Sequence, residues 1–535
     1  MFQTSSKYFP AQSKILRGMP WVGRVAFAEL KEKVKEISAR PIVCASCGAA
    51  LTNPDLIKIH PSKGKTFTCE FCGTLNVIPK DLMPGTDLSE FILGRLTTAK
   101  PITEDTLLAV IDISGSMGGG KLAAVKDSLI RTITDLGINA PKTTFGLIAF
   151  HSDVYIYDEK MSKIITLSGD IRYSVDKITK EIEKALKKIE LKSLEKTRKK
   201  WVENVEKLQS LDMTALGPAI VSAYVIMKER GGRIILLTDG LANEGVGALE
   251  SASSTGAQLY EDLSAQATNA GIIIDVVAIK DPSAFMALEA LAVMPMQTGG
   301  TMYYAELGEL SDAISAQSRA KIIARNVRLR IIAPKGVDVA EVSGLGQPKP
   351  EHLQRGIHMG PVTEDRELYV RLSPKTKVKE KEIPIQLQVT YMDDDGKQRI
   401  RVVTQRVKVT EEAKPIIDTL DAEMPATFAV QRAGEEQYRG DVAESREILE
   451  KTQQAMRAIG KQAPKRLAKE MERVDHVLTK QIKEAKEVAV RQEKEAAHRA
   501  PMRASQVAAI ADEDAASSMQ RSRQSSKRLF EEEED

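Results

Sequence analysis

Residues 107–121 read LLAVIDISGSMGGGK, and this stretch decides the fold of the middle of the chain. It opens with an apolar run, interrupted only by Asp112, that leads through serines and glycines to a helical pattern near Lys121. A short apolar run without alternation is typical of a parallel strand buried on both faces. A strand that passes through a glycine turn into a helix is the repeating unit of a doubly wound sheet.

Three further runs of this kind follow at residues 145–150, 234–237 and 272–279, with helical segments between them. Together they predict an α/β domain over residues 100–320, doubly wound around a mostly parallel sheet. Inside it, residues 171–211 are rich in lysine and glutamate, with apolar residues at helical spacing. We expect an inserted helical hairpin there, whose charged face is solvated or, alternatively, docks a partner.

The flanking segments predict further modules. Residues 321–412 alternate apolar and polar side chains around an Asp-Gly turn, which favours an antiparallel β-sandwich. Residues 413–498 have helical periodicity, and we expect a helical hairpin whose apolar seam packs on the sandwich or binds a partner. Residues 1–39 contain a weak strand pattern followed by a short helical pattern. Residues 499–535, ending in an acidic run, predict a disordered tail.

The four cysteines of the chain form two Cys-x-x-Cys pairs within residues 40–85: Cys44, Cys47, Cys69 and Cys72. Four soft thiolates can close tetrahedrally around Zn²⁺, and they leave no open position for catalysis. A glycine follows each pair and allows the backbone to turn its amides toward the sulfurs. We therefore predict a structural zinc ribbon; an iron–sulfur cluster and two redox motifs are the alternatives.

A second constellation lies where predicted strands end. Asp112, Ser114 and Ser116 follow the first strand, Thr214 opens a later helix, and Asp239 follows another strand. The carboxyl ends of parallel strands meet at one edge of a sheet, where open α/β sheets bind ligands. Hydroxyl and carboxylate oxygens at this edge suit a hard divalent ion.

In this order the five residues resemble the metal-ion-dependent adhesion site (MIDAS) of von Willebrand factor A domains. The resemblance implies that Ser114, Ser116 and Thr214 contact Mg²⁺, or Mn²⁺ or Ca²⁺, while Asp112 and Asp239 act directly or through water. It also implies that an acidic residue of a partner protein completes the coordination. The alternative is a domain that has kept the loops and lost the ion.

A phosphate-binding pattern overlaps the same loop. Glycines from Gly115 to Gly120 precede Lys121, with the spacing of a nucleotide-binding loop. Leu122 stands where a hydroxyl should hold magnesium, and this interpretation leaves Asp112 and Thr214 unexplained. None of the six histidines accompanies a nucleophile motif, so we expect no enzyme.

The order of modules sharpens the resemblance. Residues 47–54 read CGAALTNP and residues 69–79 read CEFCGTLNVIP, and these ribbon motifs precede the A domain, the sandwich and the helices. Over roughly residues 15–500 the chain resembles the inner-coat subunits of the COPII vesicle coat. The resemblance implies a zinc finger, a trunk, a sandwich completed by a strand within residues 16–27, and a helical domain. The gelsolin-like domain of that family has no counterpart here.

Composition limits the remaining function classes. Lysine plus arginine number 77 against 74 aspartates and glutamates, and aromatic residues make up 4%, so nucleic-acid binding is not expected. No apolar run approaches the roughly 18 residues of a membrane span. Paired cysteines without an apolar leader favour the cytoplasm, with any membrane association peripheral.

Two functions follow from these observations. The first is non-enzymatic protein–protein interaction, in which the A domain binds an acidic partner residue through its ion. The alternative is a COPII-like coat or scaffold subunit in vesicle transport, with coat-like or small-GTPase partners and a dispensable ion site.

Overall fold

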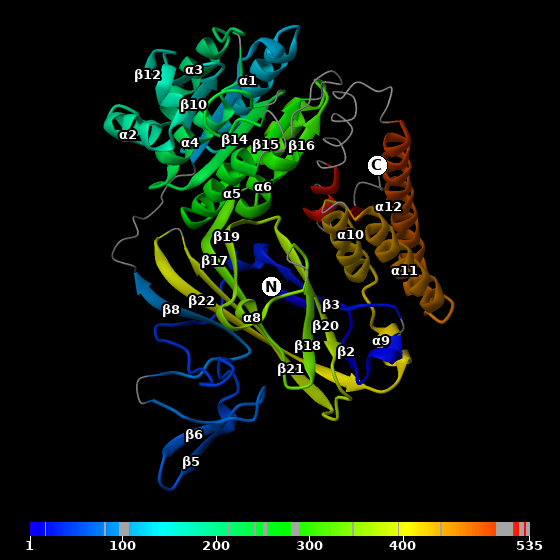
Figure 1. Ribbon diagram of the computed structural model, residues 1–535. Coiled ribbons are helices and arrows are strands. Elements are labelled where there is room, and N and C mark those ends of the chain that lie inside the picture. The colour runs from blue at the N-terminus through cyan, green and yellow to red at the C-terminus, as the bar shows by residue number, and fades with distance from the viewer. Residues whose placement is uncertain are drawn as a thin grey trace.

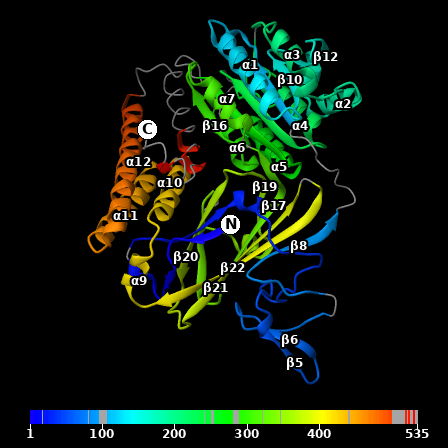
Figure 2. The ribbon, with the colours of Figure 1, turned by 180° about the vertical axis from the view of Figure 1, so that it is seen from behind.

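The computed structural model describes most of the chain. The described residues are 1–16, 18–79, 82–95, 106–211, 213–239, 242–249, 254–279, 288–319, 321–344, 347–393, 395–438, 441–498, 517–519, 521–523 and 529–530. In Figure 1 a β-sandwich lies at the centre, with the α/β trunk domain above it, the small ribbon below it and the helical domain at its right; Figure 2 shows the same arrangement from behind.

The trunk domain is an α/β domain in which helices cover both faces of a mostly parallel sheet. The predicted fold class is therefore confirmed. Its strand order is β12-β11-β10-β9-β14-β15-β16, with β11 and β12 antiparallel at one edge. The strands are β9 (Thr106–Asp112), β10 (Thr144–Phe150), β11 (Val154–Tyr157), β12 (Lys163–Leu167), β14 (Gly232–Thr238), β15 (Ile272–Ile279) and β16 (Met302–Ala305). Every residue of β9, β10, β14 and β15 is buried, as the continuous apolar runs require.

Helices cover both faces of this sheet (Figure 1). One face carries α1 (Lys121–Asn139), α3 (Leu194–Val205) and α7 (Leu310–Arg319). The other carries α2 (Val175–Ala185), α4 (Leu216–Met227), α5 (Ser254–Asn269) and α6 (Leu288–Thr298).

The predicted helical hairpin at residues 171–211 is wrong. Ile178 and Ile182 of α2 are buried in the core on one face of the sheet, whereas Leu194 and Trp201 of α3 are buried on the opposite face. Between the two helices, β13 (Lys192–Ser193) pairs with the start of β10 at the sheet itself. The charged residues form the outer surface of two helices that complete the domain, because the apolar residues of each helix belong to a different layer.

The sandwich packs two sheets around one core. One sheet has the order β1-β3-β20-β18, formed by β1 (Phe2–Thr4), β3 (Trp21–Ala26), β20 (Glu367–Pro374) and β18 (Val337–Val342). The other has the order β19-β17-β21-β22-β8-β4, with β2 beside β22. Its strands are β2 (Tyr8–Pro10), β4 (Glu36–Ile37), β8 (Leu88–Arg95), β17 (Ile322–Ile332), β19 (Ile357–Thr363), β21 (Glu382–Met392) and β22 (Lys397–Thr410).

The ribbon is formed by a segment that lies, in the chain, between strands of the sandwich. β1 to β4 come before it in the chain and β8 comes after it, and all five strands lie in the sandwich sheets. The ribbon itself holds β5 (Ile57–His60), β6 (Gly64–Thr68) and β7 (Leu75–Val77). The sequence pattern did not indicate β8, because its eight residues mix apolar residues with Ser89, Glu90 and Gly94.

The helical domain contains α9 (Ala413–Asp418), α10 (Glu423–Tyr438), α11 (Val442–Gly460) and α12 (Lys465–His498). α11 and α12 form the predicted hairpin, with Leu467, Met471 and Val474 buried along its seam. α10 lies between the hairpin and the sandwich, where Met424 and Phe428 cluster with Val22 and Tyr369. No helix in the described part of the chain is both long and apolar enough to cross a bilayer.

Among the described residues, the short elements are the helix α8 (Pro350–Arg355) and five 3₁₀ turns. The turns are η1 (Ser13–Leu16), η2 (Phe27–Lys31), η3 (Pro54–Leu56), η4 (Gly115–Met117) and η5 (Gly169–Tyr173).

The prediction of a disordered tail at 499–535 is wrong for the tail residues that the structure describes; the rest of that range lies outside the described residues. Met519 and Phe530 are buried in the trunk and helical cores, respectively. Arg521 donates to Gln437 of α10 and forms an ion pair with Glu484 of α12. Arg523 donates to the carbonyl of Met296 in the trunk. In its described part the tail therefore ties the helical domain to the trunk, through the burial of Met519 and Phe530 and the hydrogen bonds of Arg521 and Arg523.

Gly434 of α10 provides a test of this tail contact. A Cβ there would lie 2.6 Å from the backbone nitrogen of Ser522 and 2.8 Å from the carbonyl oxygen of Ser518. Gly434→Ala should displace the tail segment and raise the rate of tryptic cleavage after Arg521 several-fold. α10 itself should not weaken, because alanine favours a helix by about 1 kcal/mol over glycine.

Gly460→Ala is the matched control, since its nearest neighbour is the flexible Met471 Sδ at 3.4 Å. Equal cleavage rates for the two variants and wild type, in limited proteolysis followed by mass spectrometry, would contradict the contact.

Candidate functional site

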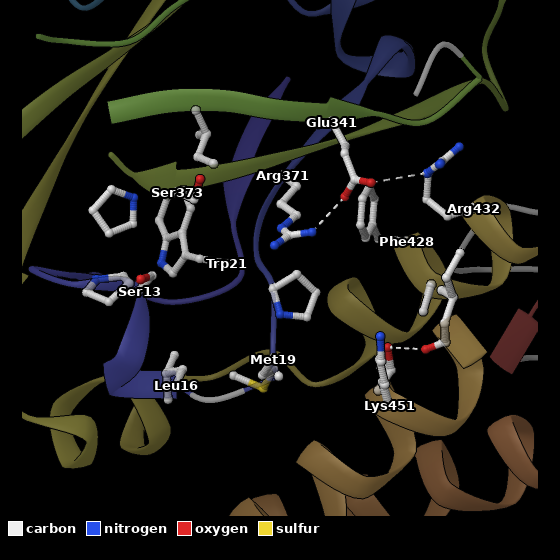
Figure 3. A pocket seen from close by; sticks show the side chains of 18 of the residues that line it. Ser13, Leu16, Met19, Trp21, Glu341, Arg371, Ser373, Phe428, Arg432 and Lys451 are labelled. Carbon is white, nitrogen blue, oxygen red and sulfur yellow. Dashed lines mark hydrogen bonds and ion pairs between the residues drawn. The ribbon is translucent and has the colours of Figure 1, made fainter. Parts of the chain in front are cut away.

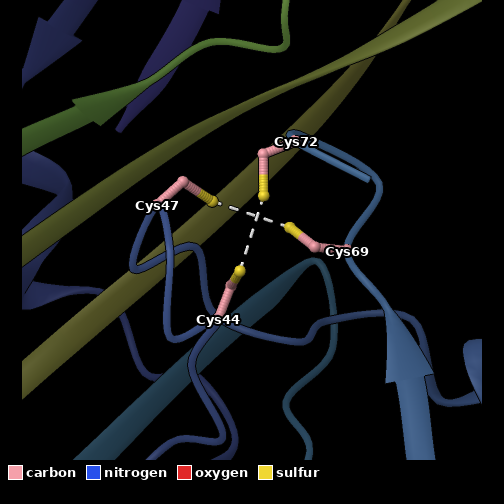
Figure 4. A group of neighbouring side chains, drawn as sticks. All are labelled: Cys44, Cys47, Cys69 and Cys72. Carbon is pink, nitrogen blue, oxygen red and sulfur yellow. Dashed lines mark hydrogen bonds between the residues drawn. The ribbon is translucent and has the colours of Figure 1, made fainter. Parts of the chain in front are cut away.

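The four predicted zinc ligands come together in the ribbon (Figure 4). Their Sγ atoms all lie within 4.8 Å of one another. Cys44 and Cys72 Sγ are 3.5 Å apart, and Cys47 and Cys69 Sγ are 3.6 Å apart. Sulfurs around a tetrahedral zinc, at about 2.3 Å from the metal, are about 3.8 Å apart, so the cluster fits this ion.

Two equivalent backbone turns position the cysteines. Gly48 N donates to Cys44 O at 2.8 Å, and Gly73 N donates to Cys69 O at the same distance. Both glycines follow the second cysteine of a pair and have positive φ, 71° and 76°. A side chain would strain this conformation, which is why glycine stands there.

The electrostatics of the cluster call for a cation. Partial burial acts to raise the pKa of Cys72, but hydrogen bonds with Thr74 and the neighbouring sulfurs outweigh it and lower the pKa to about 6. The hydrogen bond with Cys47, together with burial, raises the pKa of Cys69. Four adjacent thiols cannot all ionise unless positive charge is bound among them. The cluster thus indicates a structural zinc site.

The sandwich holds the first cysteine turn directly. Arg330 of β17 donates from Nη2 to Cys47 O at 2.8 Å and from Nη1 to Gly48 O at 3.4 Å. Gln388 of β21 donates to Gly48 O at 2.9 Å. On the other side, Arg406 of β22 forms an ion pair with Glu70 at 2.6 Å. Groups that orient ligands in this way tune metal affinity.

The second predicted site lies at the carboxyl edge of the trunk sheet. β9 and β14 run parallel as neighbours, with Ile111 opposite Leu237, so Asp112 and Asp239 leave the sheet beside each other. Both carboxylates are fully buried. The structure therefore brings residues from two of the three predicted loops to one point, as parallel strand ends should.

Asp112 is bound by its own surroundings. Its Oδ1 accepts from the Ser114 amide at 2.8 Å, and its Oδ2 accepts from the Thr238 hydroxyl at 2.7 Å. Burial raises the pKa of Asp112 to about 6, against the opposing effect of these hydrogen bonds. No sequence motif pointed to Thr238, although it directly precedes Asp239.

Asp239 is bound in the same way. Its Oδ1 accepts from the Ser116 hydroxyl at 2.7 Å, and Ser116 Oγ lies 3.0 Å from Ser114 Oγ. Its Oδ2 accepts from Lys121 Nζ at 2.6 Å. In the sequence, Lys121 belongs to the phosphate-binding pattern. In the structure, its ammonium faces the carboxylate of Asp239.

Thr214 lies at this edge because backbone hydrogen bonds tie its loop there. Its amide donates to Asn243 Oδ1 at 2.9 Å. The loop is tied to the edge by Leu211 N, which donates to Ile113 O, and by Ala215 N, which donates to His151 O. The structure thus joins Asp112, Ser114, Ser116 and Asp239 in one network of hydrogen bonds, and places Thr214 beside them.

The donor set is that of a hard-ion site, but the arrangement does not fit a divalent ion. Each oxygen of Asp112 and Asp239 already accepts from a protein donor, and one of these donors is the Lys121 ammonium. A divalent ion bound there would lie within a few ångströms of that like charge. The phosphate-binding interpretation fails too, because the lysine that would meet phosphate is paired with an acid.

A cavity of about 350 Å³ lies between the sandwich and the helical domain (Figure 3). It was not predicted from the sequence. Trp21, Met19 and Phe428 supply apolar walls. Glu341 pairs with Arg371 at 2.9 Å and with Arg432 at 3.8 Å. These charges compensate one another within the wall. No local sequence signal exists, because the cavity joins segments far apart in the chain.

Comparison with known proteins agrees with this architecture. Residues 106–312 match the family model of the Sec23/Sec24 trunk domain. Circularly permutated Ras protein 1 of Dictyostelium discoideum is 22% identical over 477 residues, which cover 81% of this chain and 56% of that protein. Protein transport protein SEC24 C of Arabidopsis thaliana is 21% identical over 352 residues, which cover 57% of this chain and 32% of that protein. The chain thus spans about half the length of the first relative, and less of the second.

Among solved structures, the human COPII-coat protein Sec24c matches with a TM-score of 0.64 and 14% identity, covering 96% of this chain and 74% of that one. This likeness shows the fold. Residues 106–312 are thus similar to the Sec23/Sec24 trunk domain, a four-cysteine cluster precedes them, and a distant similarity to Sec24 proteins extends over most of the chain. The predicted resemblance is confirmed.

Removal of zinc should unfold the ribbon and leave the trunk folded, because the ribbon has a small core built around its cysteines. We expect a chelator of zinc to expose all four thiols to a thiol reagent and to open the ribbon to protease, while the thermal unfolding of the trunk is unchanged. A ribbon that stays protected after zinc has been removed would contradict a structural metal site.

Arg330→Met should weaken the hold on the Cys47 turn. We expect zinc release to a colorimetric chelator to be roughly tenfold faster than in wild type, as for other groups that support metal ligands. Arg328→Met is the control, since Arg328 is an exposed residue of the same strand. Release rates that do not differ between these two variants would show that Arg330 has no such role.

Proposed function

We propose that this chain is a non-enzymatic scaffold subunit of the COPII inner-coat type, which binds other proteins through the surfaces of its trunk and sandwich. The trunk family match and the distant similarity to Sec24 proteins support this role. The chain covers only part of its relatives, so the partners remain part of the proposal. They would be coat proteins and a small GTPase, met in the cytoplasm or on the surface of intracellular membranes.

The observation that carries the proposal is the way in which the sandwich joins the other modules. The ribbon is held to it by Arg330, Gln388 and Arg406. The trunk meets it where Thr268 of α5 packs against Gly360 of β19 and where Arg325 of β17 donates to Arg230 O. Modules fixed in this way offer one continuous binding platform, which is what a coat subunit needs.

Binding of an acidic partner residue through a divalent ion is the second candidate function. The convergence of Asp112, Ser114, Ser116 and Asp239 favours it, since these are the oxygens that such a site uses. The Lys121 ammonium in the same network weighs against it. On balance the coat-type role is the better supported, with the ion site dispensable.

Affinity purification from cytosol and membranes separates the two functions. Wild type and Ser114→Ala/Ser116→Ala should each be used with magnesium and in magnesium-free buffer, with zinc present throughout to keep the ribbon intact. We expect the same coat proteins, in equal amounts, in all four samples, because the contacts do not pass through an ion.

Ser162→Ala/Ser168→Ala is the matched control, since both serines are exposed on the trunk. Partners that are lost from both the site variant and the magnesium-free samples, but kept by this control, would make ion-mediated binding the function instead.

A further inference from the structure

The trunk crevice contains a charge that its sequence motif does not include. Lys121 Nζ lies 2.6 Å from Asp239 Oδ2, and the side chains of the two residues are 16% and 0% exposed. Asp239 is one of the five predicted ion ligands. A positive charge beside a fully buried carboxylate stabilises its ionised form, and for Asp239 a side chain of the same domain provides that charge.

We propose that the Lys121 ammonium takes the place of the divalent ion in this crevice, so that the trunk neutralises the site itself and binds no Mg²⁺, Mn²⁺ or Ca²⁺ there. This inference concerns the chemistry of the crevice and does not depend on the coat-type role.

The glycine loop brings Lys121 to this position. Gly119 and Gly120 have φ of 68° and 107°, and Gly120 is the N-cap from which α1 starts. These conformations are readily available only to glycine. They turn the chain so sharply that Lys121, the first residue of α1, faces the end of β14. The glycines that resemble a phosphate-binding loop therefore act here to place a lysine.

Each carboxylate oxygen of Asp112 and Asp239 has a protein donor without an ion. The two oxygens of Asp112 accept from the Ser114 amide and the Thr238 hydroxyl. The two oxygens of Asp239 accept from the Ser116 hydroxyl and the Lys121 ammonium. An incoming divalent ion would have to displace these donors and would be repelled by the ammonium, since like charges at short range disfavour each other strongly in a poorly solvated site.

Replacement of Lys121 by a neutral residue should allow the crevice to bind a divalent ion. Lys121→Met keeps most of the side-chain volume and removes the charge, which leaves Asp239 without its cation and the serine hydroxyls near it. We expect this variant to gain Mn²⁺ binding at least tenfold tighter than wild type, and Ser116→Ala in the same background to abolish the gain. Free Mn²⁺ can be measured by electron paramagnetic resonance on the zinc-loaded full chain.

Lys126→Met is the matched control. Lys126 lies on the same helix, its side chain is 15% exposed, and its ammonium donates to the carbonyl of Glu206 instead of an acid of the crevice. This variant should bind Mn²⁺ no better than wild type. Wild-type binding as tight as that of Lys121→Met, or no gain in a folded Lys121→Met, would overturn the proposal.

A second measurement, which needs no Lys121→Met protein, decides the case if that variant does not fold. Addition of Mn²⁺ to the zinc-loaded chain should leave the unfolding temperature of the trunk unchanged, since an ion stabilises only a fold that binds it. A rise in that temperature which Ser116→Ala removes would overturn the proposal. Neither result bears on which proteins the chain captures, so the coat-type role is tested separately.

Discussion

The pairing of β3 with β20 is the contact on which the rest of the architecture depends. It joins the beginning of the chain, Trp21 opposite Leu372 and Val25 opposite Leu368, to the late part of the sandwich. With this pairing the four-stranded sheet covers the core against the larger sheet. The ribbon then lies between two anchored points, since β3 precedes it and β8 follows it. Arg330 and Gln388 fix its orientation by donating to the carbonyls of the first cysteine turn. The ribbon is thus a tethered part of the sandwich surface.

Residues that act through local chemistry were predictable from the sequence. The apolar runs of β9 and β14 predicted a sheet buried on both faces, and the turns after Cys47 and Cys72 predicted the converging thiols. Asp112 and Asp239 were placed together because parallel strands end at one edge. In each case a short segment contains all the information that its conformation needs.

Features that depend on tertiary partners were not predictable. α10 is buried on nearly all sides, so that even its polar residues Gln431 and Glu435 are buried. Arg432 of the same helix forms ion pairs with Glu435 and Glu436. The periodicity of residues 171–211 was correct for each helix, but it could not tell that α2 and α3 pack on opposite faces of the sheet. The tail predicted disorder because it is rich in alanine, serine and arginine and ends in an acidic run, yet Met519, Leu529 and Phe530 in its described part are buried against other domains.

Lys121 shows how a motif can keep its residues and change its chemistry. The five positions of the ion site were all present in the sequence, and nothing in their spacing opposed a metal. The residues that oppose a metal are the three glycines before Lys121 and Lys121 itself, which in the sequence resemble a phosphate-binding loop. Positive φ at Gly119 and Gly120 turns that lysine onto Asp239, and a buried carboxylate accepts an ammonium as readily as an ion when the ammonium is already held in place. A trunk built in this way can keep its crevice folded whatever the supply of divalent ions, because the charge that compensates Asp239 belongs to the chain itself.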